Sequence, residues 1–276
     1  MIELNIDFKV HLKKYILKHK LFKANHNSIY TLDRILRVIE YVLKTGSSWR
    51  TLDLEIFDPD LKWQSIYYHF DKFSKAKVFE NVYLEILNEY FKKRRCEKLK
   101  YVSVDASMVK NYYASNVGFN GHYKKKKWSK LSLFVDSNGV PISALLVPGN
   151  HSDKSLFFRN MKRLKVNINA IKTTNNRCKR YFLADAAYDS QDVRDAIKKK
   201  NINPIIWYVK RKRKQPELNK KLDKRETLIY KKRMIVENCF SWLYKNKRLN
   251  GRYDKYNRNY YSFMYMGFLR ILLKRM

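Results

Sequence analysis

The spacing of apolar residues changes at the basic run Lys92 to Lys100, and this change limits the folds that the chain can adopt. Before the run, apolar side chains recur at helical spacing, as in Tyr30 to Leu43, and Gly46 follows as the expected C-cap. After the run, short β-rich segments alternate with segments typical of helices. We therefore expect a small all-α domain over residues 1–97 and an α/β domain over residues 98–276.

The N-terminal segments Lys62 to Phe79 and Val82 to Phe91 also have helical spacing. Short helices joined by tight turns on a basic background are typical of helix-turn-helix-like DNA-binding modules. A plain helical bundle, with Trp49 and Phe70 in its core, explains the pattern equally well, so both interpretations stay open here.

The second domain is expected to contain a mixed sheet flanked by helices. Asp136-Ser137-Asn138-Gly139 predicts a hairpin turn between two of its strands. The expected strands are Tyr101–Val104, Lys130–Val135, Val140–Val147, Tyr181–Ala184 and Ile202–Trp207. The expected helices are Asp153–Leu164, Gln191–Lys200 and Arg225–Leu249.

The charge of the chain calls for a large anionic partner. Its 60 Lys and Arg against 25 Asp and Glu give a net charge of +35, which repels itself unless an anion compensates it. Nucleic acid is the first candidate. A membrane is disfavoured, because the most apolar stretch, Phe263 to Leu273, is interrupted by Arg270 and is shorter than the roughly 18 residues of a spanning helix. No signal-peptide pattern is found at the N-terminus, so we expect an intracellular, DNA-associated protein.

Two aspartates follow predicted strands, Asp105 in YVSVDAS and Asp185 in YFLADAAYDS. At the same edge of a sheet their carboxylates would repel each other unless a cation lies between them, and Mg²⁺ prefers such oxygen ligands. Glu237 in the last predicted helix offers a third carboxylate, with Arg233 and Tyr230 on the same helix face, four and seven residues before it. An ordinary helix salt bridge is the simpler interpretation of Arg233 and Glu237. The three carboxylates together indicate a metal-dependent nucleic-acid enzyme.

These motifs resemble those of insertion-sequence transposases of the DDE class, in particular the group named after insertion sequence five. The matching segments are SSWRTLDLEIFDP, VSVDAS, VDSNGVPISALLVPGNHSDKSLF, FLADAAYDS and YKKRMIVENCFSWLYKNKRLNGRYDK. Their order follows that of the family over nearly the whole chain. Within PGNHSD, we interpret His151 and Asp153 as a structural loop and N-cap.

The resemblance implies a ribonuclease-H-like core in which Asp105, Asp185 and Glu237 hold two Mg²⁺ ions, with Mn²⁺ as a substitute. It implies cleavage at terminal inverted repeats and strand transfer into target DNA. The expected partners are double-stranded DNA and further copies of the chain, in a homodimer or higher synaptic complex, with no membrane. The residues expected to bind DNA are Tyr230, Arg233, Lys245, Arg248, Lys124, Lys125, Lys126 and Lys127.

The sequence departs from the family pattern at two places. Tyr244 stands where the family usually has a lysine seven residues after the glutamate, and Lys245 is one step further round the helix. Lysines in GHYKKKKWSK replace glycine of the family's basic segment. Three alternatives therefore remain: a metal-dependent nuclease that cuts without joining, an inactive or domesticated DNA-binding derivative, and a basic RNA-binding protein.

Overall fold

The computed structural model describes residues 6–23, 28–115, 117–119, 127–164, 166, 179–209 and 221–276. The chain forms two compact units: Met1–Leu87 with Lys110–Ser115 and Trp242–Met276 form unit 1, and Asn88–Val109 with Asn116–Ser241 form unit 2. The C-terminal segment thus belongs with the N-terminal helices. The division of DNA binding and catalysis at residue 97 stays a prediction.

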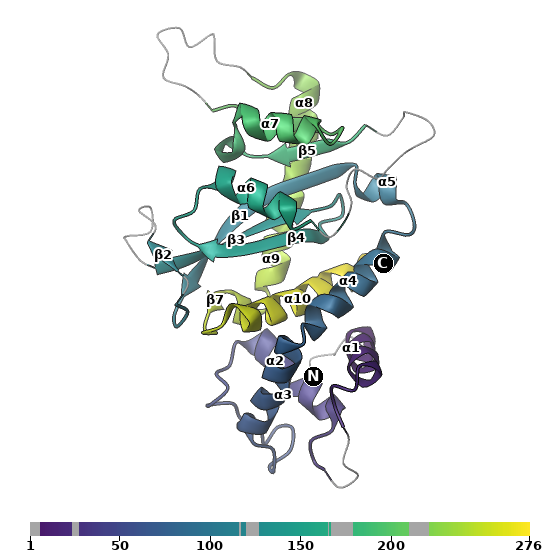
Figure 1. Cartoon of the computed structure of the whole chain (residues 1–276), viewed down its shortest axis with the longest axis vertical. Coiled ribbons are helices and arrows are strands. Elements are labelled where there is room, and N and C mark those ends of the chain that lie inside the picture. The colour runs from purple at the N-terminus through teal and green to yellow at the C-terminus, as the bar shows by residue number, and fades with distance from the viewer. Residues whose placement is uncertain are drawn as a thin grey trace. The chain divides into compact units, whose positions relative to one another are not determined.

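Unit 1 is mainly helical (Figure 1). Its elements are α1 (Ile6–Lys18), α2 (Leu32–Thr45), α3 (Trp63–Lys75), most of α4 (Val78–Tyr90), the 3₁₀ turn η5 (Lys247–Leu249), β7 (Gly251–Arg252) and α10 (Asn257–Leu273). Gly46 has φ +73° and its N–H donates to the Val42 carbonyl at 3.0 Å, which confirms the predicted C-cap of α2.

The core of unit 1 is aromatic. The ring centroid of Phe70 lies 5.2 Å from that of Trp49 and 4.6 Å from that of Phe263 on α10. Burial of these rings removes a large apolar area from water and stabilises the packing of α10 against the N-terminal helices. Trp49 and Phe70 are therefore core residues, as the bundle interpretation expects. None of the helices described here is both long and apolar enough to cross a membrane.

Unit 2 contains a mixed sheet. Its strands are β1 (Tyr101–Asn111), β2 (Gly118–Phe119), β3 (Lys127–Val135), β4 (Pro141–Pro148), β5 (Tyr181–Ala184) and β6 (Asn203–Ile206). The order is β2-β3-β1-β5-β6, with β4 antiparallel to β3 and with β1, β5 and β6 parallel. The predicted hairpin between β3 and β4 is confirmed, and Gly139 has φ +79° in its turn.

Helices cover both faces of this sheet. They are α6 (Asp153–Lys162), α7 (Gln191–Lys198), α8 (Lys224–Tyr230) and α9 (Met234–Tyr244), and a short α5 (Arg95–Lys98) precedes β1. Phe182 packs against Phe157 of α6 with ring centroids 5.5 Å apart, whereas its neighbours Tyr181 and Leu183 pack with Ile229 of α8. In Figure 1, α6 lies in front of the sheet and α9 behind it. The predicted mixed sheet flanked by helices is confirmed.

Two predicted elements differ from the structure. The first strand continues to Asn111 instead of ending at Val104, because it pairs with β3 and, at Lys110 and Asn111, with β7. The long helix predicted over Arg225–Leu249 is divided into α8, the 3₁₀ turn η4 (Lys231–Arg233) and α9. The Asn246 side chain donates to the Leu243 carbonyl at 2.9 Å, which satisfies an end carbonyl of α9 and helps to end it.

Candidate active site

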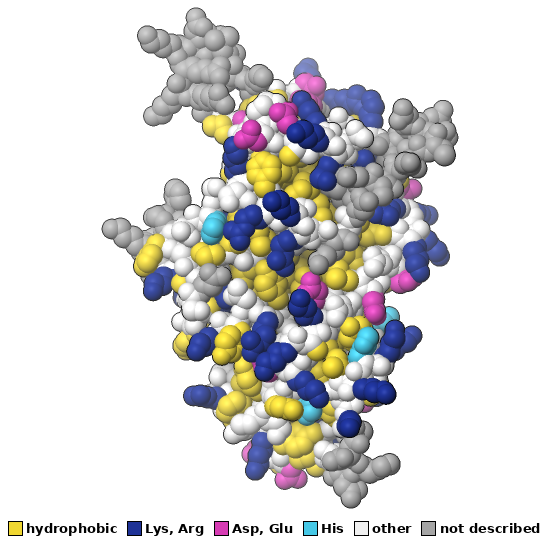
Figure 2. All heavy atoms as spheres, viewed as in Figure 1, with side chains coloured by type: hydrophobic (Ala, Val, Ile, Leu, Met, Phe, Trp, Pro, Cys, Tyr) yellow, Lys and Arg dark blue, Asp and Glu magenta, His cyan; other side chains and the backbone are white. Residues whose placement is uncertain are grey.

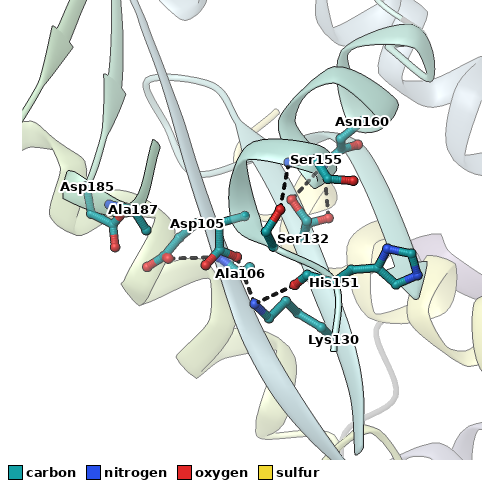
Figure 3. A network of polar contacts seen from close by, with 11 residues as sticks. Asp105, Ala106, Lys130, Ser132, His151, Ser155, Asn160, Asp185 and Ala187 are labelled. Atoms are coloured by element: carbon teal, nitrogen blue, oxygen red, sulfur yellow. Dashed lines mark hydrogen bonds and ion pairs between the residues drawn. The ribbon is translucent and has the colours of Figure 1, made fainter. Parts of the chain in front are cut away.

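Asp105 on β1 lies at the same level as Asp185, which directly follows the neighbouring parallel strand β5. Ser103 of β1 pairs with Leu183 of β5, and each aspartate lies two residues beyond that pair. Adjacent strands are about 4.8 Å apart, so the register alone brings the two side chains together. Figure 3 shows Asp105 between the Asp185 side of the site and Lys130.

Backbone amides fix both carboxylates. The N–H of Ala106 donates to Asp105 Oδ1 at 2.8 Å. The N–H of Ala187 donates to Asp185 Oδ1 at 2.9 Å, because Asp185 is the N-cap of the 3₁₀ turn η2 (Ala186–Tyr188). The other oxygen of Asp105, Oδ2, accepts from Arg233.

Burial raises the pKa of both aspartates above the ordinary value. For Asp105 the negative charge of Asp185 raises the pKa further, while the Ala106 amide and Arg233 oppose the increase. For Asp185 the charge of Asp153 adds to the effect of burial. Burial disfavours the ionised form of these carboxylates, and a cation beside them would stabilise that form.

Arg233 joins the first and third predicted carboxylates. Its Nη1 donates to Asp105 Oδ2 at 3.1 Å, and its Nη2 donates to Glu237 Oε1. The Arg233 side chain is 15% exposed, so both bonds are only partly screened by water. The predicted pairing of Arg233 and Glu237 across one helix turn is therefore present, and it reaches β1 as well.

Two aromatic residues border the same place. The Arg233 guanidinium lies 5.8 Å from the centre of the Tyr230 ring. The Tyr230 ring in turn lies 5.3 Å from that of Trp207, which is 43% exposed just after β6. An exposed indole beside the carboxylates is a suitable surface for stacking on a base.

The structure adds Lys130 and Asp153 to the site. Lys130 Nζ donates to Asp153 Oδ1 at 3.0 Å and to the His151 carbonyl at 3.1 Å (Figure 3). The predicted capping role belongs to Ser152, whose Oγ accepts from the N–H of Ser155 at 3.3 Å. The PGNHSD motif was a signal for this neighbourhood, but only the fold shows that the Asp153 charge acts on Asp185.

The donor chemistry of the site fits a hard divalent cation. Asp105, Asp185 and Glu237 offer only carboxylate oxygens, the ligands preferred by Mg²⁺ and Mn²⁺. Within the described part of the chain, no three Asp, Glu, His or Cys residues are gathered closely enough to hold a metal ion. Instead, the Arg233 guanidinium supplies positive charge between Asp105 and Glu237.

The residues expected to bind DNA are distributed over both units. Tyr230 and Arg233 belong to the site, whereas Lys245 is exposed in unit 1. Lys127 is exposed at the start of β3, with its Nζ 5.6 Å from the centre of the Phe119 ring. Residues Lys124, Lys125 and Lys126 lie outside the described residues.

Arg248 does not have the surface position that a phosphate contact needs. It is 4% exposed, and its guanidinium bonds to Asp254 at 2.9 Å and to the Ser47 carbonyl at 3.0 Å. We therefore assign Arg248 to the packing of unit 1. Elsewhere, Lys and Arg side chains are spread over the face drawn in Figure 2, where Asp and Glu are fewer.

Comparison with known proteins identifies the family. The family model described as "Transposase DDE domain" matches residues 98–269, more than half of the chain. The chain belongs to this DDE transposase family. A Burkholderia cepacia protein, provisionally named the transposase for insertion sequence element IS402, is 24% identical over 150 residues. That match covers 54% of this chain and 65% of the relative, just under two thirds of its length.

Solved transposase structures resemble this DDE-family chain more weakly. A piggyBac transposase synaptic complex with hairpin DNA is similar over 95% of this chain and 71% of that chain, at 10% identity and a TM-score of 0.46. A Mos1 mariner paired end complex with Mn is similar over 95% of this chain and 84% of that chain, at 11% identity and a TM-score of 0.35.

Proposed function

We propose that this DDE-family chain is a DNA transposase that cuts at the terminal inverted repeats of an insertion sequence and joins the ends to target DNA. One observation carries the proposal. Two carboxylates with raised pKa, Asp105 on β1 and Asp185 directly after the parallel strand β5, lie at the same level of the sheet, and Arg233 links Asp105 to Glu237. Family membership and the charge of +35 agree with a DNA substrate.

In this proposal Asp105, Asp185 and Glu237 hold two Mg²⁺ ions, or Mn²⁺ as a substitute. When bound, such ions activate a water or 3′-hydroxyl nucleophile and stabilise the leaving oxygen of the phosphodiester. Arg233 orients the carboxylates of Asp105 and Glu237, and its positive charge also suits the phosphate of the cut strand. Trp207, exposed beside Tyr230, stacks on a base next to the cut.

The proposed partners are double-stranded element ends, target DNA and further copies of the chain. Two ends must be cut together, so a homodimer or larger synaptic complex is expected. Residues 1–97 are proposed to bind the ends as a helix-turn-helix-like domain, and Lys245 and Lys124–Lys127 to contact phosphates. An intracellular, DNA-associated location follows from such a substrate.

The test is a cleavage and strand-transfer assay on DNA that carries the gene's own flanking ends, with Mg²⁺, Mn²⁺ or EDTA. The wild type should cut and join only when metal is present. Asp105→Asn and Glu237→Gln should lose both activities while they keep DNA binding, because an amide is a poorer ligand and carries no charge. Asp192→Asn is the matched control, since Asp192 is exposed and pairs with Lys154 on the surface.

Cleavage by Asp105→Asn at the wild-type rate would refute the assignment of the carboxylates. Metal-dependent nicks without joining would indicate the nuclease instead. Binding without cutting under every metal condition would indicate an inactive derivative. That alternative is favoured by one observation, Tyr244 in place of the family lysine, and Tyr244→Lys would then be the variant to measure.

A further inference from the structure

Unit 1 contains a basic pocket beside the C-terminal end of α10. It has a volume of about 520 Å³ and lies where the C-terminal ends of α2, α9 and α10 meet. This volume falls within the range of small-molecule sites and exceeds the space that a single ion needs. Its lining residues are Lys44, Trp242, Lys245, Asn246, Gly267, Arg270, Ile271, Lys274 and Arg275.

Five cationic side chains and no acidic side chain line the pocket. One of them, Lys44, has an acidic partner, because its Nζ is 2.8 Å from Glu40 Oε1. Glu40 is only 2% exposed, so it compensates Lys44 from behind the pocket wall. Because the charged residues that line this hollow are all cationic, it attracts an anion strongly.

Several of these groups are held in place by packing. Arg270 Nη1 donates to Asn246 Oδ1 at 3.0 Å, and Asn246 is buried and tied to the Leu243 carbonyl at 2.9 Å. The Arg275 guanidinium lies 4.5 Å from the centre of the Trp242 ring. A cation positioned in this way loses less conformational entropy when it binds a ligand.

Gly267 lets the wall of the pocket form. A Cβ on Gly267 would lie 2.7 Å from Leu243 Cδ1, closer than real contacts allow. The missing side chain therefore permits α10 to pack closely against the end of α9, and this packing brings Arg270 towards Lys245 and Asn246.

Helix dipoles explain part of this charge. A cation near a helix C-terminus is stabilised by the unpaired carbonyls there, and Lys44 and Arg270 lie in the last turns of α2 and α10. The partial negative charge at each helix C-terminus is offset by one cation. It does not account for Lys274 and Arg275, which follow α10 and line the same pocket.

We propose that the basic pocket binds a phosphate of the DNA backbone, together with the nucleotide that carries it. The proposal rests on the proposed function, because DNA is the polyanion that a transposase handles. The guanidinium groups of Arg270 and Arg275 match phosphate geometry, and Trp242 offers an aromatic ring at the pocket wall. The pocket is thus a DNA contact in unit 1, formed by residues other than the three carboxylates.

The test is the salt dependence of binding of the full chain to a fluorescent duplex that carries the gene's own ends. Lys274→Gln/Arg275→Gln removes two exposed cations beyond the last residue of α10 and leaves the core intact. Each lost phosphate contact lowers the magnitude of the slope of log K against log salt by about 1, and the pocket holds one phosphate, so the slope of the variant should fall in magnitude by about 1. The affinity should fall at least fivefold at low salt.

The matched control is Lys198→Gln/Lys199→Gln, which removes the same charge from exposed residues at the C-terminal end of α7. The control should change the slope by less than half as much. Equal changes of the slope in the two variants would overturn the proposal that the pocket binds DNA, because the loss of any two surface cations would then have the same effect. Titration with dAMP separates a free nucleotide from DNA: dAMP binding that the pocket variant loses, with an unchanged DNA slope, would also overturn the proposal.

Cleavage by the same proteins separates this inference from the proposed function. Suppose that the pocket variant binds and cuts DNA as the wild type does, while Asp105→Asn does not cut. The proposal that the pocket binds DNA is then wrong, and the transposase assignment stands. If the wild type neither binds nor cuts DNA, both are wrong.

Discussion

Asp136, in the turn between β3 and β4, makes the folding stability depend on pH. Its carboxylate is completely buried, with Oδ1 accepting from the N–H groups of Asn138 and Val140 at 2.9 and 2.8 Å. Its Oδ2 accepts from the Tyr90 hydroxyl at 2.8 Å. Burial nevertheless dominates and raises the pKa of Asp136 from 3.8 to about 6.

The native state therefore binds the Asp136 proton more tightly than the unfolded chain does. The contribution of this group to stability is greatest below pH 3.8 and declines as pH rises towards about 6. The difference between the two pKa values corresponds to about 3 kcal/mol, at roughly 1.4 kcal/mol per pH unit. About 2 kcal/mol of this loss falls between pH 4 and pH 7.

Asp136→Asn removes the ionisation and keeps the shape. Its amide oxygen can still accept from Asn138 and Val140, and its amide nitrogen can donate to Tyr90. Urea unfolding of the full chain at pH 4 and pH 7 measures the effect, with Asp192→Asn as the surface control. The stability of Asp136→Asn relative to the wild type should increase by about 2 kcal/mol from pH 4 to pH 7. A difference that stays constant with pH, or that decreases, would refute the assignment of a raised pKa to this buried group.

Three further predictions concern other contacts. Arg233→Ala should lower the free energy of unfolding at pH 7 by about 2 kcal/mol, because it leaves Asp105 half-buried without its cation, and adding Asp105→Asn should recover part of the loss; no recovery in the double variant would contradict the pairing. Asn160→Ala should cost about 1–3 kcal/mol in urea unfolding, because the buried Ser143 hydroxyl bonds to the Asn160 side chain, and a loss below about 0.5 kcal/mol would contradict this. Trp207→Ala should weaken binding of single-stranded DNA about tenfold in fluorescence anisotropy without lowering the melting temperature, and unchanged affinity would exclude stacking on the exposed indole.

Local patterns in the sequence predicted much of the sheet of unit 2. Asp185 follows β5 where expected, and the Asp136–Gly139 turn joins β3 to β4. Asp105 was expected at the end of its strand but lies within β1, which continues to Asn111 because Lys110 pairs with Gly251, a residue far along the chain. The spacing of residues along the sequence predicts local helices and strands, but it does not predict which distant segments pair.

Sequence patterns did not predict features that depend on which side chains are buried and which come together in the folded chain. The C-terminal helix α10 is buried on nearly all sides, so it has no polar face from which a helical period could be read. Arg248 was predicted to contact DNA from the surface, but it is buried and forms an ion pair with Asp254. Neither the Asp153 charge near Asp185 nor the pocket around Arg270 is visible before the chain is folded.

The central claim is that Asp105, Asp185 and Glu237 act as one metal site. Mn²⁺ binding to the complex of the full chain with its own end DNA, followed by electron paramagnetic resonance, tests this most directly. The wild type and Asp192→Asn should bind Mn²⁺ equally well, whereas Asp105→Asn, Asp185→Asn and Glu237→Gln should each bind it at least about tenfold more weakly. Wild-type Mn²⁺ affinity in all three carboxylate variants would contradict the account.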